Sequence, residues 1–278
     1  MKKISRRSFL AAAGLSVAAL ALTACGGSAS SVASSVASSA SSAAASTSAA
    51  AGELTTVEAG KLTMATNAAF PPYEMTTDAG DFEGIDIETA QAIADKLGLE
   101  LQIDDMDFDA ALLSVQQGKA DIVMAGVTVT DERKAVMDFS DSYATGIQSI
   151  IVPEGSDIAS PDDLAGKKIG TQRGTTGYIY CSDDFGEDSV VAYDSGLTAV
   201  QALNNGQVDA VVIDNAPATE YVAANPGLKV LDTSYAEEDY AIGMAKGSAL
   251  EDAVNKALEE LKADGTLQAI VDKYINAN

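Results

Sequence analysis

A segment that could bind an anion follows an apolar run that ends at Gly126. Gly126 leaves the backbone open to close approach, Thr128 offers a hydroxyl group, and Arg133 carries a planar fork of N–H donors that matches a carboxylate. The spacing therefore indicates a site for a carboxylate group. The alternative is that Arg133 lies on the surface and pairs with a nearby acid such as Asp131 or Asp138.

A candidate ligand for a cation, Asp214, ends the apolar segment 208–214 (VDAVVID). An aspartate at such a junction either caps the N-terminus of a helix that begins at Asn215 or accepts hydrogen bonds from a bound cation. The two roles are compatible if one carboxylate oxygen faces a cleft.

Two loop segments could complete a ligand site. Residues 172–177 (QRGTTG) follow a predicted strand and open a predicted helix, so their backbone N–H groups favour an anion. They are not a nucleotide-binding P-loop, because no Gly-Lys-Ser/Thr sequence follows. Residues 67–73 (NAAFPPY) contain two prolines that predict a rigid turn. Phe70 in this turn could line a pocket together with Phe108, or both rings could belong to the core.

Strand and helix patterns alternate from Leu54 onward, which predicts an α/β protein with mostly parallel sheets. Strands are expected at 61–67, 99–103, 120–126, 147–153, 167–171, 190–193, 208–214 and 240–246. Helices are expected at 90–97, 108–115, 250–261 and 266–275, and after Thr176.

One internal similarity suggests two equivalent halves. Residues 111–126 align without gaps on residues 199–214, and both read as a helix, a glycine stop, an aspartate and an apolar strand. If the match is more than coincidence between two βαβ-type units, each half has its own sheet. Gly126 and Asp214 then end equivalent strands, and ligands of open α/β sheets bind at such carboxyl ends, in a cleft between lobes.

The composition excludes several classes of function. The 278 residues contain 17 Lys and Arg against 41 Asp and Glu, a net charge of −24, which argues against a nucleic-acid partner. The chain has no histidine, which excludes histidine-based catalysis and histidine metal ligands. Cys25 and Cys181 are its two cysteines, too few for a disulfide framework or a thiolate metal cluster. No cofactor or metal is expected.

The N-terminus predicts an export signal and a lipid anchor. Residues 1–24 combine four cations with an apolar run that is too short for a confident membrane span. The sequence Leu-Thr-Ala-Cys at 22–25 resembles the lipobox of bacterial lipoproteins, in which Cys25 becomes the N-terminus and carries diacylglycerol and palmitate-type acyl chains. Residues 25–52 are then a lipidated cysteine followed by a flexible Ser/Ala-rich linker. Two acyl chains suffice for stable attachment.

Four segments carry a resemblance to the family 3 solute-binding proteins of ABC transporters, the receptors for polar amino acids. They are 67–74 (NAAFPPYE) with 83–88 (EGIDIE) downstream, 106–140 with its AGVTVTDERKAVMDFS end, 167–177 (KKIGTQRGTTG) and 208–217 (VDAVVIDNAP). The sequences QRGTTG (172–177) and NAAFPP (67–72) most resemble those of receptors for basic amino acids. The resemblance implies a type II periplasmic-binding-protein-like fold, with two α/β lobes joined by a two-strand hinge. It places lobe 1 at 53–147 and 242–278 and lobe 2 at 148–241.

The resemblance also implies roles for individual residues. Arg133 matches the arginine that grips the ligand's α-carboxylate, and Asp214 matches the aspartate that takes its α-ammonium group. The remaining implied contacts are the groups around the carboxylate (Gly126, Thr128 and Thr176), the aromatic walls (Phe70 and Phe108) and the positions that face the ligand side chain (Asn67 and Gln172). Asn67 stands where an acid is common in the family, which leaves the preferred side chain open.

These expectations describe a monomeric receptor on the extracytoplasmic face of the cell membrane. It is attached through lipid, binds a free amino acid and delivers it to the permease of an ABC importer. The sequence also allows two other functions. An enzyme on the same scaffold, a dehydratase or a lyase, would need a positioned acid or base, for which Glu74 and Asp86 are the candidates. A ligand-sensing surface protein would instead signal to a partner.

Overall fold

The computed structural model describes residues 54–275, and 1–53 and 276–278 lie outside it. The expected signal peptide, Cys25 and the expected linker therefore fall outside the described residues. Within the described part of the chain, no helix is long and apolar enough to cross a membrane.

The first lobe is built on a five-stranded sheet in the order β5-β1-β6-β14-β7. β1 pairs in parallel with β5 and β6, whereas β14 pairs antiparallel with β6 and β7. The strands are β1 (Lys61–Thr66), β5 (Glu100–Asp105), β6 (Ile122–Val123), β7 (Met137–Phe139) and β14 (Gly243–Ala245). The helices of this lobe are α1 (Ile85–Leu97), α2 (Phe108–Gln116), α3 (Asp131–Val136), α7 (Glu251–Ala263) and α8 (Thr266–Ile275).

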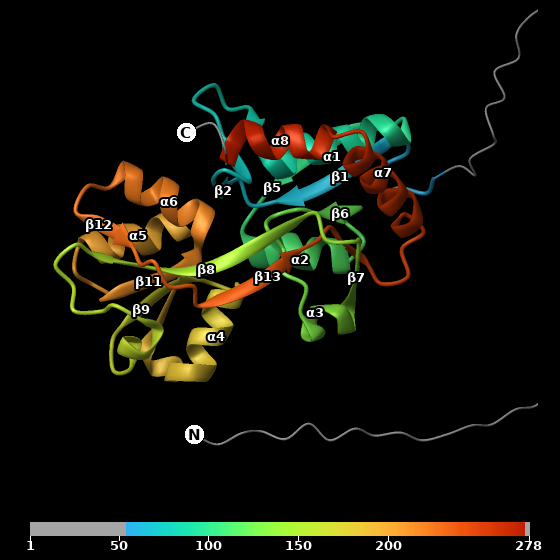
Figure 1. The fold of residues 1–278 in the computed structure, drawn as a ribbon. Coiled ribbons are helices and arrows are strands. Elements are labelled where there is room, and N and C mark those ends of the chain that lie inside the picture. The colour runs from blue at the N-terminus through green and yellow to red at the C-terminus, as the bar shows by residue number, and fades with distance from the viewer. Residues whose placement is uncertain (1–53, 276–278) are drawn as a thin grey trace, which may run out of the picture. The chain divides into compact units, whose positions relative to one another are not determined.

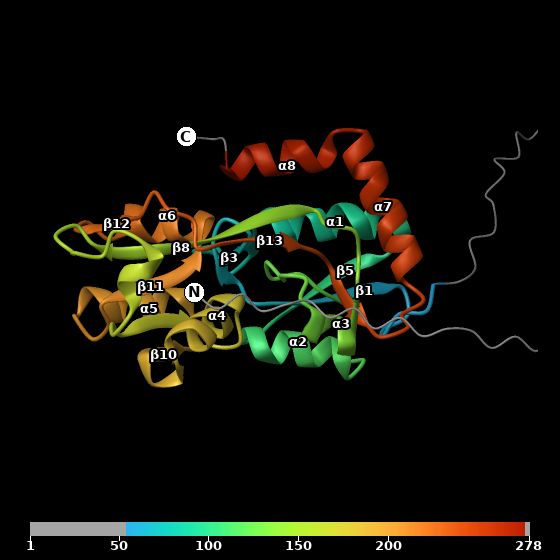
Figure 2. The same cartoon turned by 60° about the horizontal axis from the view of Figure 1, so that its bottom comes forward.

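In helix α1 the local sequence determines both the face that packs into the first lobe and the residue at which the helix ends. Its apolar positions Ala90, Ile93 and Ala94 are fully buried, which is the face that the periodicity predicts. Gly98 ends the helix in the left-handed conformation (φ 70°) that an L side chain rarely adopts. The last two helices, α7 and α8, pack against α1, so the beginning and the end of the described chain share one core (Figures 1 and 2).

The second lobe holds a sheet in the order β10-β9-β11-β8-β12, with β13 paired to β8. β9 pairs in parallel with β10 and β11. The strands are β8 (Ala144–Pro153), β9 (Ile169–Gln172), β10 (Val190–Tyr193), β11 (Ala210–Asp214), β12 (Leu228–Val230) and β13 (Ala236–Tyr240). The helices are α4 (Thr176–Phe185), α5 (Gly196–Asn204) and α6 (Asn215–Ala224), with short 3-10 turns at Pro161–Leu164 and Glu187–Ser189.

The two lobes are connected by β8 and β13, which run side by side as antiparallel partners (Figure 2). Their register joins Tyr240 to Ala144 and Ala236 to Gln148. These crossing strands correct the expectation of mostly parallel sheets. Each sheet has a parallel core of three strands, but β8, β12, β13 and β14 add antiparallel pairs, so both sheets are mixed.

The internal similarity corresponds to equivalent structure in the two lobes. Helix α2 precedes strand β6 of the first sheet, and helix α5 precedes strand β11 of the second. Both aspartates of the repeat have the same role: Asp121 accepts a hydrogen bond from the backbone N–H of Thr63 at 2.8 Å, and Asp209 accepts one from Lys168 at 2.8 Å. Each half therefore has its own sheet, as the repeat predicts.

A third, small sheet was not expected from the sequence. It contains β2 (Ala69–Phe70), β3 (Glu74–Thr76) and β4 (Phe82–Glu83) in that order, and it leads into α1. Gly84 precedes α1 with φ 131°, and a Cβ atom there would lie 2.2 Å from the carbonyl oxygen of Tyr73. This close backbone approach places Glu74 beside the first turn of α1.

Candidate functional site

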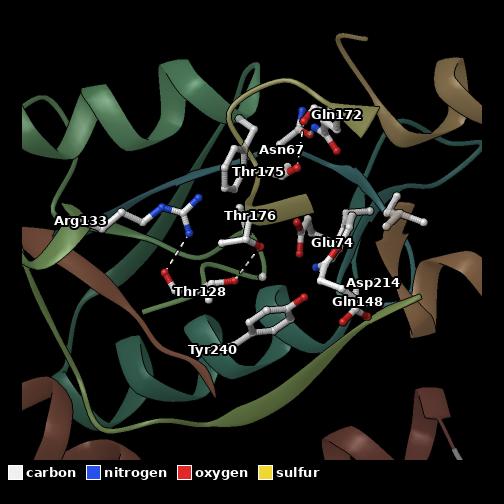
Figure 3. Close-up of a pocket in the computed structure, with 15 residues that line it drawn as sticks. Asn67, Glu74, Thr128, Arg133, Gln148, Gln172, Thr175, Thr176, Asp214 and Tyr240 are labelled. Atoms are coloured by element: carbon white, nitrogen blue, oxygen red, sulfur yellow. Dashed lines mark hydrogen bonds between the residues drawn. The ribbon is translucent and has the colours of Figure 1, made fainter. Parts of the chain in front are cut away.

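One cavity is lined by residues from both lobes (Figure 3). All nine ligand-binding residues expected from the sequence lie on its wall: Asn67, Phe70, Phe108, Gly126, Thr128, Arg133, Gln172, Thr176 and Asp214. The structure thus brings together side chains that are up to 147 positions apart in the chain.

Arg133 is presented by the short helix α3. The hydroxyl of Thr130 caps this helix by accepting a hydrogen bond from the Arg133 backbone N–H at 3.2 Å. The Arg133 side chain is buried, and its guanidinium donates to the carbonyl oxygens of Thr128 at 2.8 Å and Gly174 at 3.2 Å. Because Gly174 belongs to the second lobe, Arg133 reaches across the cleft. The alternative of a surface arginine is wrong.

The electrostatic surroundings of Arg133 suit an anion. Its guanidinium carbon lies 5.3 Å from the centre of the Phe108 ring, in a cation–π arrangement. Burial lowers the pKa of Arg133, and the nearby Glu238 carboxylate acts in the opposite direction. A guanidinium keeps its charge in proteins and carries five N–H donors, so it can serve further acceptors besides these two carbonyls.

Two threonine hydroxyls lie next to each other on this wall, one from each lobe. The Oγ1 atoms of Thr128 and Thr176 are 3.5 Å apart. Thr128 also donates to Glu238 Oε2 at 3.1 Å, and the Gln148 amide donates to the same oxygen at 3.0 Å. Since Glu238 lies on β13 and Gln148 on β8, both crossing strands are hydrogen-bonded into the site.

Asp214 is the N-cap of α6, the first of the two roles that the sequence allows. Its Oδ1 accepts from the backbone N–H of Ala216 at 3.0 Å and its Oδ2 from Ile147 at 2.7 Å, and the Tyr240 hydroxyl is a further donor. Burial raises the pKa of Asp214 to about 6, and these hydrogen bonds act in the opposite direction. Asp214 and Arg133 come from opposite lobes and line the same cavity.

Direct hydrogen bonds join the lobes at the other side of the cavity. The Gln172 amide donates to Asn67 Oδ1 at 2.8 Å, and the Tyr221 hydroxyl donates to the Ala69 carbonyl oxygen at 2.6 Å. Asn67 also donates to the carbonyl oxygen of Met106 at 2.9 Å. The structure therefore has its two lobes in contact around the cavity.

The glycine expected to expose backbone has a second role. Gly126 adopts φ 54°, and a Cβ atom at this position would lie 2.9 Å from the Phe70 ring. Its backbone N–H donates to Asp86 Oδ2 at 3.0 Å. Gly126 thus makes room for Phe70, and its N–H group is already bonded.

Six further lining residues were not among the expected binding residues: Glu74, Ala125, Gln148, Thr175, Ile213 and Tyr240. Glu74 is notable because its side chain is fully buried. The sequence singled it out only as an acid that an enzyme could use. Tyr240 lies at the end of β13, a strand that the sequence pattern did not indicate.

Two α/β lobes that enclose a polar cavity, joined by two crossing strands, define a substrate-binding protein of the two-lobed class. The chain belongs to the bacterial extracellular solute-binding proteins, family 3, whose family model matches residues 62–277.

Its relatives are amino-acid-binding proteins. It is 34% identical to a probable histidine-binding protein of Neisseria gonorrhoeae, over 95% of this chain and 94% of that protein. It is 34% identical to the L-cystine-binding protein TcyJ of Escherichia coli, over 80% of this chain and 85% of that protein. It resembles the structure of the arginine-, lysine-, histidine-binding protein ArtJ of Geobacillus stearothermophilus, with a TM-score of 0.75 and 34% identity over 78% of this chain and 96% of that one. These are binding proteins rather than enzymes, so an enzyme on this scaffold is not supported.

Proposed function

We propose that this protein binds a free polar amino acid in the cavity between its lobes and delivers it to an ABC importer. The observation that carries the proposal is the placement of Arg133 and Asp214 on opposite lobes around one buried cavity. An α-amino acid carries a carboxylate and an ammonium group on one carbon, so it can engage both. Family membership and the amino-acid-binding relatives support the same function.

In this proposal Arg133 takes the α-carboxylate, with Thr128 and Thr176 beside it. The guanidinium is held at a fixed angle by its bond to the Thr128 carbonyl oxygen and by the Phe108 ring. Because its orientation is set before the ligand arrives, less side-chain entropy is lost on binding. Asp214 accepts hydrogen bonds from the α-ammonium group. A carboxylate offers about four acceptor positions, so positions remain free beside those that its backbone contacts use.

Ligand contacts on both lobes would favour the arrangement in which the lobes meet. Charge-assisted hydrogen bonds contribute about 1.5–3 kcal/mol each. A few of them reach the roughly 5.5 kcal/mol that inverts a 1:99 population. We place the hinge on β8 and β13, at 147–152 and 239–243, and keep 53–147 with 242–278 and 148–241 as the lobe bounds. The permease would recognise the arrangement in which the lobes meet.

A thermal-shift screen of the L-amino acids tests the function. At a ligand concentration of about 100 Kd, binding adds about 2.7 kcal/mol to the free energy of unfolding. For a protein of this size that raises Tm by roughly 5–10 °C. The matched controls are the decarboxylated amines of the ligands that bind, which lack the group that Arg133 would hold. No stabilisation by any L-amino acid would contradict the proposal, and so would equal stabilisation by the amine.

We further propose that Cys25 carries lipid and tethers a monomeric receptor to the outer face of the cell membrane. Without residues 1–24 the chain keeps 13 Lys and Arg against 41 Asp and Glu, so an anionic surface repels it and attachment depends on the acyl chains. Cys25→Ser should move the protein from the membrane fraction to the soluble extracytoplasmic fraction, with Cys181→Ser as the control that leaves it on the membrane. Cys25→Ser protein that stays membrane-bound would refute the anchor.

A further inference from the structure

Gln148, on the connecting strand β8, lines the cavity with a side-chain oxygen that has no donor. The residue is 5% exposed, and its Oε1 atom accepts no hydrogen bond from any group of the described chain. A buried amide oxygen without a partner is costly, because it has left water and found no other donor. Buried polar atoms in native proteins are nearly always bonded, so the unpartnered oxygen points to a donor on the ligand.

The orientation of the Gln148 amide is determined by Glu238. The amide nitrogen of Gln148 donates to Glu238 Oε2 at 3.0 Å, and the Thr128 hydroxyl donates to the same oxygen at 3.1 Å. Because a carboxylate accepts hydrogen bonds and donates none, the amide nitrogen must face Glu238 and the amide oxygen must face the other way. Glu238 is 6% exposed and lies on β13, which pairs with β8, so both connecting strands hold this bond in place.

The Gln148 side chain lies beside Asp214. Strands β8 and β11 pair antiparallel with Gln148 opposite Asp214, and such residues have their side chains on the same face, with Cβ atoms about 4.5–5.5 Å apart. Figure 3 shows the two residues together at one end of the cavity, away from Arg133. The Gln148 oxygen also lies against the first turn of α4, since a Cβ atom at Gly177 would be 2.9 Å from it. A carboxylate and an amide oxygen are thus neighbouring acceptors on the cavity wall.

We infer that Gln148 is a binding residue for the α-ammonium group of the ligand, and that Glu238 is a positioning residue that directs the Gln148 oxygen toward this group. The inference rests on the proposed function. An ammonium group has three N–H donors, whereas both oxygens of Asp214 already accept a backbone N–H, from Ala216 and Ile147. A second acceptor beside Asp214 engages a further donor, and the ammonium group supplies the partner that Gln148 Oε1 lacks.

This arrangement has a consequence for specificity. A ligand without the α-ammonium group leaves two buried acceptors unpaired instead of one, so the cavity rejects it more strongly than Asp214 alone would. Gln148 also differs from Arg133 and Asp214 in its place in the fold, because it lies on a strand that connects the lobes. The ligand is therefore bonded to each lobe and to the connection between them.

Isothermal titration of the mature protein with matched ligands tests the role of Gln148. Each L-amino acid that binds in the thermal-shift screen is paired with the acid that has hydrogen in place of the α-ammonium group. For L-arginine this acid is δ-guanidinovalerate, and for L-glutamine it is glutaramate. The measured quantity is the ratio of the two affinities, in which changes common to both ligands cancel.

Gln148→Met should lower this ratio at least about 10-fold, the scale of a hydrogen bond to a charged group. Methionine keeps the approximate length and volume of the side chain, but its thioether sulfur is only a weak acceptor. The loss should fall on the amino acid, while the affinity for the acid without the ammonium group stays within about threefold of wild type. A role in folding or in strand pairing alone would weaken both ligands alike and leave the ratio unchanged.

Glu238→Gln tests the positioning role. The new amide can also donate, so it no longer determines which end of the Gln148 amide faces the cavity, and the ratio should fall at least about fivefold. Glu237→Gln is the matched control, because it removes an equal charge from an exposed position of the same strand, and it should keep the ratio within about twofold of wild type. Added to Gln148→Met, Glu238→Gln should change the ratio by less than about twofold, because its effect depends on Gln148.

The outcomes separate this inference from the function on which it rests. If wild type binds no amino acid, the proposed function fails. If amino acids bind but the ratio is the same in Gln148→Met as in wild type, Gln148 does not bind the ammonium group and the amino-acid receptor stands. If Glu238→Gln alone keeps the wild-type ratio, or lowers it equally with and without Gln148→Met, the positioning role is overturned. Should Gln148→Met not fold, Glu238→Gln alone decides, since it leaves Gln148 in place.

Discussion

Arg133→Ala is expected to weaken the binding of every L-amino acid that the protein takes by at least about 100-fold, because truncating one partner of a buried charged hydrogen bond costs about 2–5 kcal/mol. The effect should be general, since the α-carboxylate is common to all these ligands. The variant also removes the guanidinium's bonds to Thr128 in its own lobe and to Gly174 in the other. Equilibrium titration with the amino acids found in the screen measures the loss.

Two variants on the same helix sharpen this result. Lys134→Ala removes an equal charge from an exposed neighbouring position of α3, and it should leave affinity within about twofold of wild type, as distant surface changes do. Arg133→Lys keeps the charge but loses the planar fork, so it should fall between wild type and Arg133→Ala. Arg133→Ala protein that still binds any amino acid within tenfold of wild-type affinity would remove Arg133 from the carboxylate site.

Gly84→Ala is expected to cause a large loss of stability. The backbone of Gly84 has φ 131°, and the added Cβ would lie 2.2 Å from the Tyr73 carbonyl oxygen and 2.9 Å from the Glu74 nitrogen. Both atoms are backbone, so the small sheet and the start of α1 must move apart. Backbone strain together with such a clash should lower the free energy of unfolding by about 3 kcal/mol or more. Tm should then fall by roughly 6–12 °C.

Gly80→Ala is the matched control for this effect. Gly80 lies in the same small sheet region with φ 89°, and a Cβ there meets no atom within 4 Å. It should show only the cost of a left-handed backbone for an L residue, about 1–2 kcal/mol. The difference between the two variants in thermal and urea unfolding isolates the close approach to Tyr73. Equal losses would show that this contact is unimportant.

Sequence patterns anticipated most of the elements because each lobe has amphipathic helices with clear stops. The expected end of α1 at Gly98, the strand at 190–193 and the helix at 266–275 agree with the structure. A strand that is covered on both faces has a continuous apolar run, which the sequence shows directly. In β8, Ile150, Ile151 and Val152 are all fully buried, and they belong to two different hydrophobic cores on the two faces of the sheet. The two-lobed class and family followed from the motifs.

The crossing strand β13 could not be predicted in this way. Its sequence (AEEDY) is mostly acidic, and Glu237 and Asp239 are exposed while Glu238 is buried by its bonds to Thr128 and Gln148. Hydrogen bonds to side chains of the site and pairing with β8 stabilise this strand, so its sequence lacks the alternation of apolar and polar residues that would predict a strand. The expected strand at 240–246 accordingly began too early: β13 ends at Tyr240, and β14 covers Gly243–Ala245.

The binding residues that lie in family-like segments could be predicted from the sequence. Residues that reach the cavity only through the packing of distant elements could not. The nine expected residues reached one cavity because strand ends of both sheets face it. Glu74 escaped notice as a lining residue because its burial depends on Asp86, Gly84 and the small sheet, none of which local sequence reveals.

The position of β14 in the first sheet has a consequence for how the chain is made. The strands of the second sheet all lie between residues 144 and 240, whereas β14, the strand between β6 and β7, comes at 243–245. A ribosome therefore produces every strand of the second lobe before the first lobe can close its sheet. Until then β6 and β7 lack their common neighbour, so a nascent chain that stops short of Gly243 exposes two unpaired edges that favour aggregation.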